Sequence, residues 1–461
     1  MANGRGTQGR GESPLCGKPT RVANMHRLTL TVVSAVLLLL LGGSPINNVA
    51  LSFSLPPAIE STLHQIPNTI AYPAAFLGTF RIGAALSVIG YPRLPSIDTE
   101  VMIGSTILRL PSSSGGARVR LFYPTNATTT PSTMTMDSSL SSSLYAPYCT
   151  DGKQTSDGMA ALVGFRQLGL SFLLRHLSSA SSGCLVDVPI INSETTSLPL
   201  LIYSHGYGGN MDMATYFFRT MASKGMIVAA VEHTDGTASS TVLDDGYERR
   251  FNEYFMTGRQ QLVRRASELL EAERFLPMEI ARRYGVTIDT IMLGGHSYGA
   301  PSAIMASNGA STSDSNIRGL ILHDPALGMG YGMLPPNGAK CRVPAVSYVS
   351  DEYNKANVRY GDITIHVRGC RHGNFVDAPL WAPRWIMSVL SLVIPVAGPS
   401  DAITVHNQLA DSAIAFLKSQ NPMSEGVSSG ELLDVVNVAP SSTAQPPPLF
   451  LRARLEGKRQ Y

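Results

Sequence analysis

From residue 198 onward, short runs of β-branched and other apolar residues alternate with longer stretches of helical periodicity. These short runs are apolar throughout, as in the strands of a parallel sheet that helices cover on both faces. One intervening stretch, 260–276, places its apolar residues on a single helical face. Strands and helices in alternation predict an α/β domain with a mostly parallel central sheet and helices on both faces. The predicted strands are Val101–Leu110 and Val119–Tyr123 upstream, and then Leu200–Ser204, Met226–Glu232, Thr290–Gly294, Gly319–Leu322, Ala345–Val349 and Ile363–Val367.

Residues 1–44 have the composition of a targeting segment. Basic residues prevail up to Arg27, the block 28–41 is mostly apolar, and small residues follow it. This is the three-part pattern of a secretory signal peptide, and the apolar block is short for a membrane span, which needs about 20 residues. We therefore expect entry into the secretory pathway, with secretion or, as the alternative, membrane association through an uncleaved signal-anchor.

The rest of the chain divides by composition into three segments. Residues 45–98 form a proline-bearing lead-in, and 99–420 carry the strand and helix patterns of the α/β domain. Within that domain, 125–158 are rich in Ser, Thr and Met, which predicts an irregular insertion. Residues 421–461 lose all periodicity and are expected to form a disordered tail.

Charge and cysteine usage exclude two classes of partner. The net charge is only +3 over 461 residues and no long basic stretch occurs, so we expect no nucleic-acid binding. The five cysteines show no CxxC pair and no ligand spacing with histidine, which argues against a zinc site. We expect neither a metal nor another cofactor.

The strongest local motif is Gly-His-Ser-Tyr-Gly at 295–299. It follows a predicted strand and precedes a helical pattern, which is the context of a nucleophile turn. A serine in this turn projects its hydroxyl from the edge of the sheet, and the glycines leave room for the tight backbone. Ser297 is therefore the candidate catalytic nucleophile.

A base and an acid must lie downstream of Ser297, because hydrolases with this turn carry serine, acid and histidine in that order. His372 lies in a glycine-flanked loop after the last predicted strand, where a base can reach the serine. His366 lies within that strand, where a structural role is expected. Asp324 and Asp351 each end a predicted strand at the carboxyl edge, and spacing alone does not separate them as the acid.

The transition state also needs backbone N–H donors for a developing oxyanion. Tyr298, which follows the nucleophile, supplies one donor in this kind of turn. The second comes from a loop after an earlier strand, and the glycine-rich stretch 205–209 follows Leu200–Ser204 directly. By position, we assign the second donor to the backbone of Tyr207.

At these residues the chain resembles a known family, the platelet-activating factor acetylhydrolases of the plasma and intracellular type II kinds. The resemblance extends over roughly 95–420 and its motifs keep their order along the chain. The nucleophile motif has Tyr298 where phenylalanine is usual. Two further departures are the Ser/Thr-rich insertion at 125–158 and Gly373, where glutamine is usual. The matching stretches are VRLFYP (119–124), PLLIYSHGYG (199–208), MIVAAVEHTDGTAS (226–239), GHSYG (295–299), SDEY (350–353) and HGNF (372–375).

The resemblance implies the α/β-hydrolase fold and favours Asp324 as the acid, with Asp351 as the alternative. It further implies a serine-dependent, calcium-independent phospholipase A2-type enzyme. Such an enzyme removes short or oxidised sn-2 acyl groups, such as acetyl, from platelet-activating factor and related phospholipids. One alternative is a general carboxylesterase or polyester hydrolase of the same fold. Another is a catalytically inactive hydrolase fold that serves as a binding protein.

An enzyme that takes its substrate from a lipid surface needs apolar side chains near its site. Two apolar stretches are candidates for membrane or lipoprotein contact, and tryptophan favours the water–lipid interface. The alternative for both stretches is a helix packed in the core. The candidate contacts are Trp381, Trp385 and Leu390 in the first stretch and Phe172 and Leu173 in the second.

Overall fold

The computed structural model describes residues 94–111, 115–127, 144–162, 165–166, 171–191, 197–310, 315–338, 341–382 and 397–420. The predicted signal at 1–44, most of the lead-in and the predicted tail at 421–461 lie outside the described residues.

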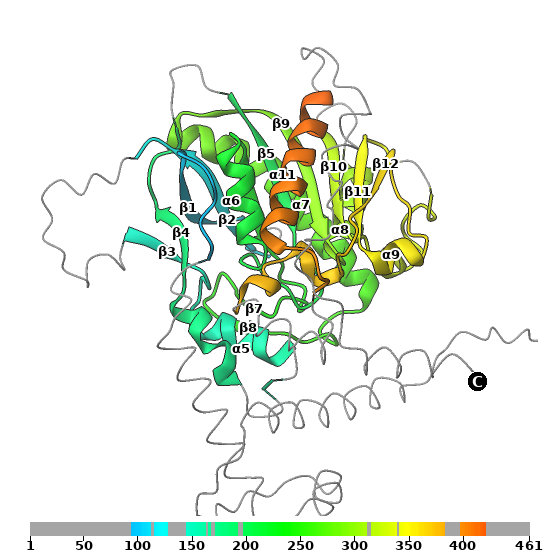
Figure 1. Cartoon of the computed structure of the whole chain (residues 1–461), viewed down its shortest axis with the longest axis horizontal. Helices are drawn as coiled ribbons and strands as arrows, with labels where there is room; N and C mark the ends of the chain where they lie inside the picture. The colour runs from blue at the N-terminus through cyan, green and yellow to red at the C-terminus, as the bar shows by residue number, and fades with distance from the viewer. Residues whose placement is uncertain are drawn as a thin grey trace, which may run out of the picture. The chain divides into compact units, whose positions relative to one another are not determined.

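A ten-stranded sheet forms the centre of the domain (Figure 1). Its strands run in the order β12-β11-β10-β9-β5-β6-β2-β1-β4-β3. The run β12-β11-β10-β9-β5-β6 is parallel throughout. Strand β2 is antiparallel to both β6 and β1. The strands are β1 Met102–Arg109, β2 Arg118–Thr125, β3 Tyr145–Pro147, β4 Ser181–Val186, β5 Ser197–Ser204, β6 Ile227–Glu232, β9 Thr287–His296, β10 Ile317–His323, β11 Ala345–Val349 and β12 Ile363–His366. A separate hairpin pairs β7 Ser240–Val242 with β8 Glu248–Arg250.

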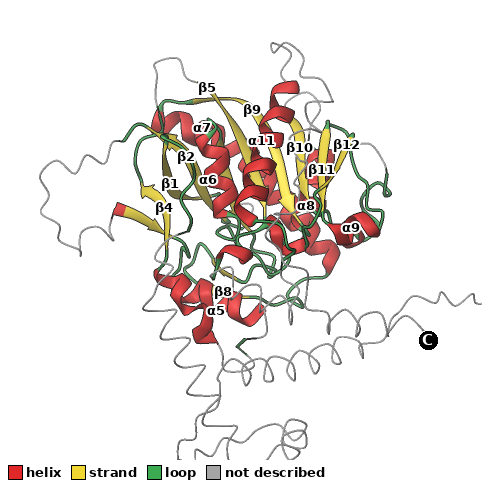
Figure 2. Ribbon diagram, in the orientation of Figure 1, coloured by secondary structure: helices red, strands yellow, loops and turns green. Residues whose placement is uncertain are grey.

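Helices cover both faces of the sheet, as predicted (Figure 2). Helices α6 Thr215–Ser223 and α11 Ala402–Ser419 pack on one face, and α7 Gly258–Tyr284 and α8 Gly299–Gly309 pack on the other. Successive residues of one strand point to opposite faces, so a strand between two helical layers must be apolar at every position. Strand β5 illustrates this, because Leu201 joins the first core and its neighbour Leu200 joins the second. The expectation of a parallel α/β domain is therefore confirmed.

Helix α7 is longer than its predicted extent of 260–276, because it continues beyond Pro277. A capping box at Thr257 begins the helix, and Gly285, in the left-handed conformation with φ 70°, ends it. Ile280, one turn after the proline, is fully buried in the core. Burial of this last turn and the two caps keep the chain helical beyond a residue that normally ends a helix.

The predicted irregular insertion at 125–158 is partly wrong. It contains strand β3, and helix α5 Lys153–Leu162 begins within it. Long-range hydrogen bonds hold this segment on the sheet: the Arg120 guanidinium donates to the Tyr148 carbonyl at 2.9 Å, and the Thr150 amide donates to Asp212 at 2.7 Å. Composition alone does not reveal such contacts. Residues 128–143 lie outside the described residues.

Neither a membrane span nor a metal site emerges from the described ranges. None of the helices there is both long and apolar enough to cross a bilayer. Equally, no cluster of three or more His, Cys, Asp or Glu side chains in those ranges could hold a metal ion.

Candidate active site

Ser297 lies between β9 and α8 in a backbone conformation that side chains rarely adopt. Its φ is 56°, in the left-handed region, where an L-residue is strained. A Cβ at Gly295 would overlap the Gly299 carbonyl, and one at Gly299 would overlap the Ser204 carbonyl. Only glycine fits at either position, so the motif spacing reflects the close packing of this turn. The structure thus contains the tight strand-to-helix turn that the sequence predicts.

The structure pairs His372 with Asp324. The imidazole Nδ1 lies 2.9 Å from Asp324 Oδ2 in the loop after β10, and the other carboxylate oxygen accepts the Ser350 amide at 2.6 Å. Asp324 is fully buried, whereas the His372 side chain is 36% exposed. A buried carboxylate with both oxygens occupied fixes the ring orientation and leaves Nε2 for proton transfer.

Asp351, the alternative acid, has a different partner. Its Oδ1 lies 2.8 Å from Nε2 of His366 and 3.3 Å from the Gly369 amide. The carboxyl edge of the sheet therefore carries two separate His–Asp pairs, and only the Asp324 pair includes His372. A third histidine, His323, is buried beneath the site and bonds to the Tyr203 hydroxyl at 2.8 Å; burial lowers its pKa to about 3.

Tyr353 packs against His372, a contact that the sequence did not indicate. Its ring stacks on His372 with the centroids 5.2 Å apart and the planes 7° apart, and its phenol lies near the Ser297 side chain. Burial raises the pKa of Tyr353 to about 12, so the phenol keeps its proton at neutral pH. The sequence offered one indication of this contact: Tyr353 follows β11 directly, in α9 Asp351–Lys355, at the sheet edge that carries Asp324 and Ser297.

His296, which precedes the nucleophile, also contacts His372. The two rings have centroids 4.4 Å apart, and Nε2 of His296 lies 3.1 Å from the His372 carbonyl oxygen. The loop that carries His372 is therefore tied to the nucleophile turn through its backbone. Ser297, Asp324 and His372 come from three segments of the chain and meet at one edge of the sheet.

The two amides assigned to an oxyanion hole flank Ser297. A Cβ at Gly206 would lie 3.1 Å from the Ser297 Cβ, so the Tyr207 loop approaches the nucleophile as closely as glycine allows. The rings of Tyr207 and Tyr298 have centroids 5.9 Å apart. Within the described part of the chain, neither the Tyr207 nor the Tyr298 backbone N–H has a hydrogen-bond acceptor. Two unpaired donors beside a serine hydroxyl are what oxyanion stabilisation requires.

Of the predicted lipid contacts, Trp381 belongs to the core. Its exposure is 7%, and its indole nitrogen donates to the Tyr148 hydroxyl at 2.8 Å. Lipid contact is therefore wrong for Trp381, because its polar atom is satisfied inside the protein. Phe172 is the second residue of the 3₁₀ helix Ser171–Ser179 and is partly buried. Trp385, Leu390 and the side chain of Leu173 lie outside what the structure describes.

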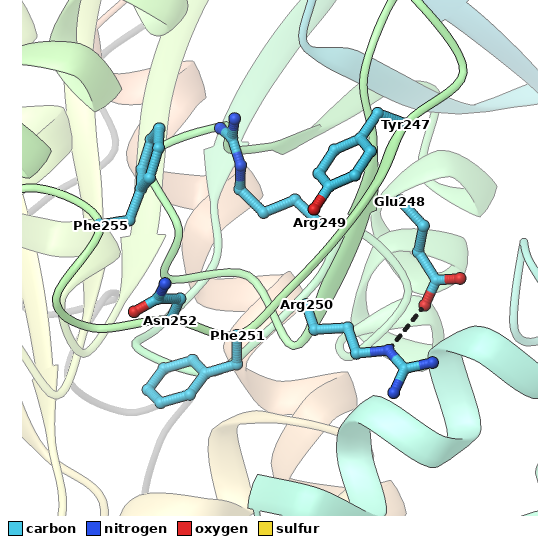
Figure 3. A pocket seen from close by; sticks show the side chains of 7 residues that line it. All are labelled: Tyr247, Glu248, Arg249, Arg250, Phe251, Asn252 and Phe255. Carbon is cyan, nitrogen blue, oxygen red and sulfur yellow. Dashed lines mark hydrogen bonds and ion pairs between the residues drawn. The ribbon is translucent and has the colours of Figure 1, made fainter.

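An open pocket contains none of the predicted catalytic residues (Figure 3). It has a volume of about 570 Å³ and is lined by 247–252 and Phe255. The Arg249 guanidinium lies 3.9 Å from the Phe255 ring centroid. The Phe251 and Tyr207 rings have centroids 5.3 Å apart, so the pocket borders the loop that carries Tyr207.

Comparison with known proteins shows what this chain is similar to. A family model described as platelet-activating factor acetylhydrolase, isoform II, matches residues 86–274. The platelet-activating factor acetylhydrolase of Bos taurus is 23% identical over 399 residues, covering 76% of this chain and 83% of that protein. That of Canis lupus familiaris is 27% identical over 157 residues, covering 34% of this chain and 32% of that protein. Among solved structures, a ferulic acid esterase from Streptomyces cinnamoneus aligns with a TM-score of 0.50 and 19% identity, covering 74% of this chain and 97% of that chain. At that identity, the match shows the fold alone.

Proposed function

We propose that this chain, an ester hydrolase related to the platelet-activating factor acetylhydrolases, removes short or oxidised sn-2 acyl groups from phospholipids without calcium. The observation that carries the proposal is the Asp324–His372 pair, 2.9 Å apart, beside a serine held on a strained turn. The acyl preference and the independence from calcium rest on the family resemblance.

In the proposed mechanism, Ser297 Oγ attacks the sn-2 ester carbonyl carbon while His372 Nε2 takes the hydroxyl proton. Asp324 holds the imidazole and stabilises its protonated form. The Tyr207 and Tyr298 amides donate to the carbonyl oxygen as it becomes an oxyanion.

The tetrahedral intermediate then collapses as His372 passes its proton to the departing lyso-lipid oxygen, which leaves the acyl group on Ser297. Water next attacks the acyl-enzyme, with His372 as the base, and releases the carboxylic acid. Each proton taken from a nucleophile is returned to a leaving oxygen, so no cofactor enters the cycle.

The proposal includes contact with a membrane or lipoprotein surface and passage through the secretory pathway. The first follows from a phospholipid substrate, which resides in an interface. The second is supported by the basic and apolar composition of residues 1–44.

Hydrolysis of phosphatidylcholines that carry acetyl, oxidised or palmitoyl sn-2 chains tests the proposal, each with calcium and with a chelator. We expect turnover of the acetyl and oxidised lipids in both conditions, with little turnover of the palmitoyl lipid. Turnover of p-nitrophenyl acetate alone would indicate a general carboxylesterase. No turnover of any ester, together with no labelling by a fluorophosphonate, would indicate an inactive binding protein.

A further inference from the structure

A cluster of buried polar side chains lies directly beneath the loop that carries Tyr207. All of its members are fully buried, and none belongs to the proposed triad. Buried polar and charged groups weaken a fold unless every one of them is paired, so such a cluster needs a reason to exist. The members are Ser204 at the end of β5, His233, Asp235 and Thr237 after β6, and Arg265 and Glu268 on α7.

Arg265 contacts both segments that supply the proposed oxyanion donors. Its Nη1 donates to the His205 carbonyl at 2.7 Å, and its guanidinium carbon lies 4.6 Å from the centroid of the Tyr298 ring. The other nitrogens are anchored, Nε by Asp235 Oδ2 at 2.8 Å and Nη2 by the Thr237 hydroxyl at 2.5 Å. A planar guanidinium fork can make these contacts together, whereas a lysine ammonium cannot.

His205 relays this anchoring to the peptide that carries the Tyr207 amide. The carbonyl of that peptide, on Gly206, accepts from Nδ1 of His205 at 2.8 Å and from the Gly209 amide at 3.0 Å. Nε2 of His205 in turn accepts the His233 amide at 3.3 Å. Because the N–H and C=O of one peptide point in opposite directions, fixing the Gly206 carbonyl also aims the Tyr207 N–H.

A second hydrogen-bond chain holds the same strand end. The Ser204 hydroxyl lies 2.7 Å from Nε2 of His233, whose Nδ1 lies 2.7 Å from Glu268 Oε2. The second oxygen, Glu268 Oε1, accepts from the hydroxyl of Thr234 at 2.5 Å and from its amide at 3.2 Å. Burial raises the pKa of Glu268 to about 8, so the carboxyl carries a proton at neutral pH. With that proton on Oε2, His233 accepts at Nδ1 and donates from Nε2 to Ser204.

We infer that Arg265, supported by the Ser204–His233–Glu268 chain, is a positioning residue that holds the Tyr207 amide in oxyanion-hole geometry. This inference rests on the proposed esterase function. It assigns to α7, which supplies no group to the triad, control over how strongly the transition state is bound.

The test compares Arg265→Lys with Arg120→Lys, measured with p-nitrophenyl acetate. Arg120 is a matched control: it is 1% exposed, pairs with Asp212 at 2.6 Å and lies 5.0 Å from the Phe122 ring, but contacts neither oxyanion segment. We expect Arg265→Lys to lower kcat per active site about 10–100-fold with KM little changed, since losing one oxyanion donor costs about 100–1000-fold. Arg120→Lys should lower the thermal midpoint and leave kcat per active site within about twofold.

The binding of a trifluoromethyl ketone adds a readout that a purely structural role would not change. This inhibitor forms a hemiketal oxyanion on Ser297, so its Ki should rise in proportion to the loss of kcat/KM. If Arg265→Lys does not fold, Thr237→Val takes its place in the test. This variant removes one anchor of the guanidinium and should show the same trend more weakly. Unchanged kcat per titrated site and unchanged Ki in the folded variants would overturn the inference. Failure of the proposed function is distinguishable, because the wild-type protein would then hydrolyse none of the phosphatidylcholines, whether or not it hydrolyses p-nitrophenyl acetate.

Discussion

The described part of the chain contains two sets of serine, histidine and carboxylic acid, one at the sheet edge and one inside. Ser297, His372 and Asp324 meet at the edge, with the His372 side chain 36% exposed. Ser204, His233 and Glu268 form the interior set, which is fully buried and has both hydrogen bonds at 2.7 Å.

The interior set has the more complete hydrogen bonding, yet no ester can reach it. The edge set differs in three respects: solvent reaches its base, its serine sits on a strained turn, and two unpaired amides flank that serine. Residue types and hydrogen bonds therefore do not by themselves make a nucleophile. Access and oxyanion stabilisation separate the two sets.

Replacing each serine by alanine gives the largest contrast. Ser297→Ala should lower esterase activity about 10⁴-fold or more without unfolding the protein, because it removes the attacking oxygen. Ser204→Ala should keep activity within about tenfold, since only a supporting hydrogen bond is lost. A fluorophosphonate should label wild type and Ser204→Ala but not Ser297→Ala. Labelling at Ser204 would show that the two sets do not differ in access.

The two aspartates at the sheet edge provide the next contrast. Asp324→Asn should lower kcat about 10⁴-fold, because an amide stabilises the wrong tautomer of His372. Asp351→Asn, which alters the pair with His366 instead, should lower kcat less than about tenfold. Steady-state kinetics of both variants, with thermal midpoints to verify folding, decide between them. The larger loss in Asp351→Asn would make Asp351 the acid.

Tyr353 has no counterpart in the interior set, and its removal should have a moderate effect. An aromatic pair contributes about 0.5–1.5 kcal/mol, so Tyr353→Ala should lower kcat about two- to tenfold by loosening His372. Tyr353→Phe retains the stacked ring and should lose less. Equal losses in the two variants would mean that the phenol contact with Ser297, rather than the stacking, matters.

Glu268 gives the smallest effect, a dependence of stability on pH. Its pKa is about 8 in the fold, raised first by burial and then by Asp235, against about 4.5 in the unfolded chain; His233 and Arg264 also face it. Between pH 5 and 8 the unfolded chain releases this proton while the folded protein keeps it, so stability falls as pH rises.

Glu268→Gln removes that titration. As the pH is raised from 5 to 8, the thermal midpoint of wild type should therefore fall relative to that of the variant, by a few degrees over the range. Glu279→Gln is the control. A hydrogen bond from Arg282 lowers the pKa of Glu279 to about 2, so this carboxyl does not titrate in this range. A midpoint difference that stays constant with pH would mean that Glu268 is ionised in the fold.

The parallel strands were predictable because each is short and apolar on both faces. Ala345–Val349 has the same bounds in the sequence prediction and in the structure, and β5, β6, β9, β10 and β12 differ from their predicted bounds by no more than three residues. Strand β4, which is parallel to β1, was not predicted. Ser297 was equally visible, because the whole turn is local in sequence. The choice between Asp324 and Asp351 was not, since it depends on which histidine each carboxylate faces across the sheet edge.

The buried polar cluster around Arg265 and Glu268 was not predicted, although the sequence contains one indication of it. Arg265 and Glu268 interrupt the apolar face of 260–276, next to Ala266 and Leu269. Charged residues on a buried helical face indicate partners elsewhere in the core, but sequence spacing does not identify them. The prediction of lipid contact for Trp381 was wrong for the converse reason. An apolar stretch has the same sequence pattern whether it packs against lipid or against protein.

The strained backbone at Ser297 has a consequence for how such proteins diverge. A side chain held at φ 56° costs about 1 kcal/mol relative to glycine, which adopts that conformation freely. Selection for thermal tolerance alone therefore favours glycine at position 297, a change that also removes the hydroxyl proposed to attack the ester. A relative with glycine at this position would be inactive but more stable, and it differs by a single substitution. Only continued selection for turnover therefore keeps the serine in place.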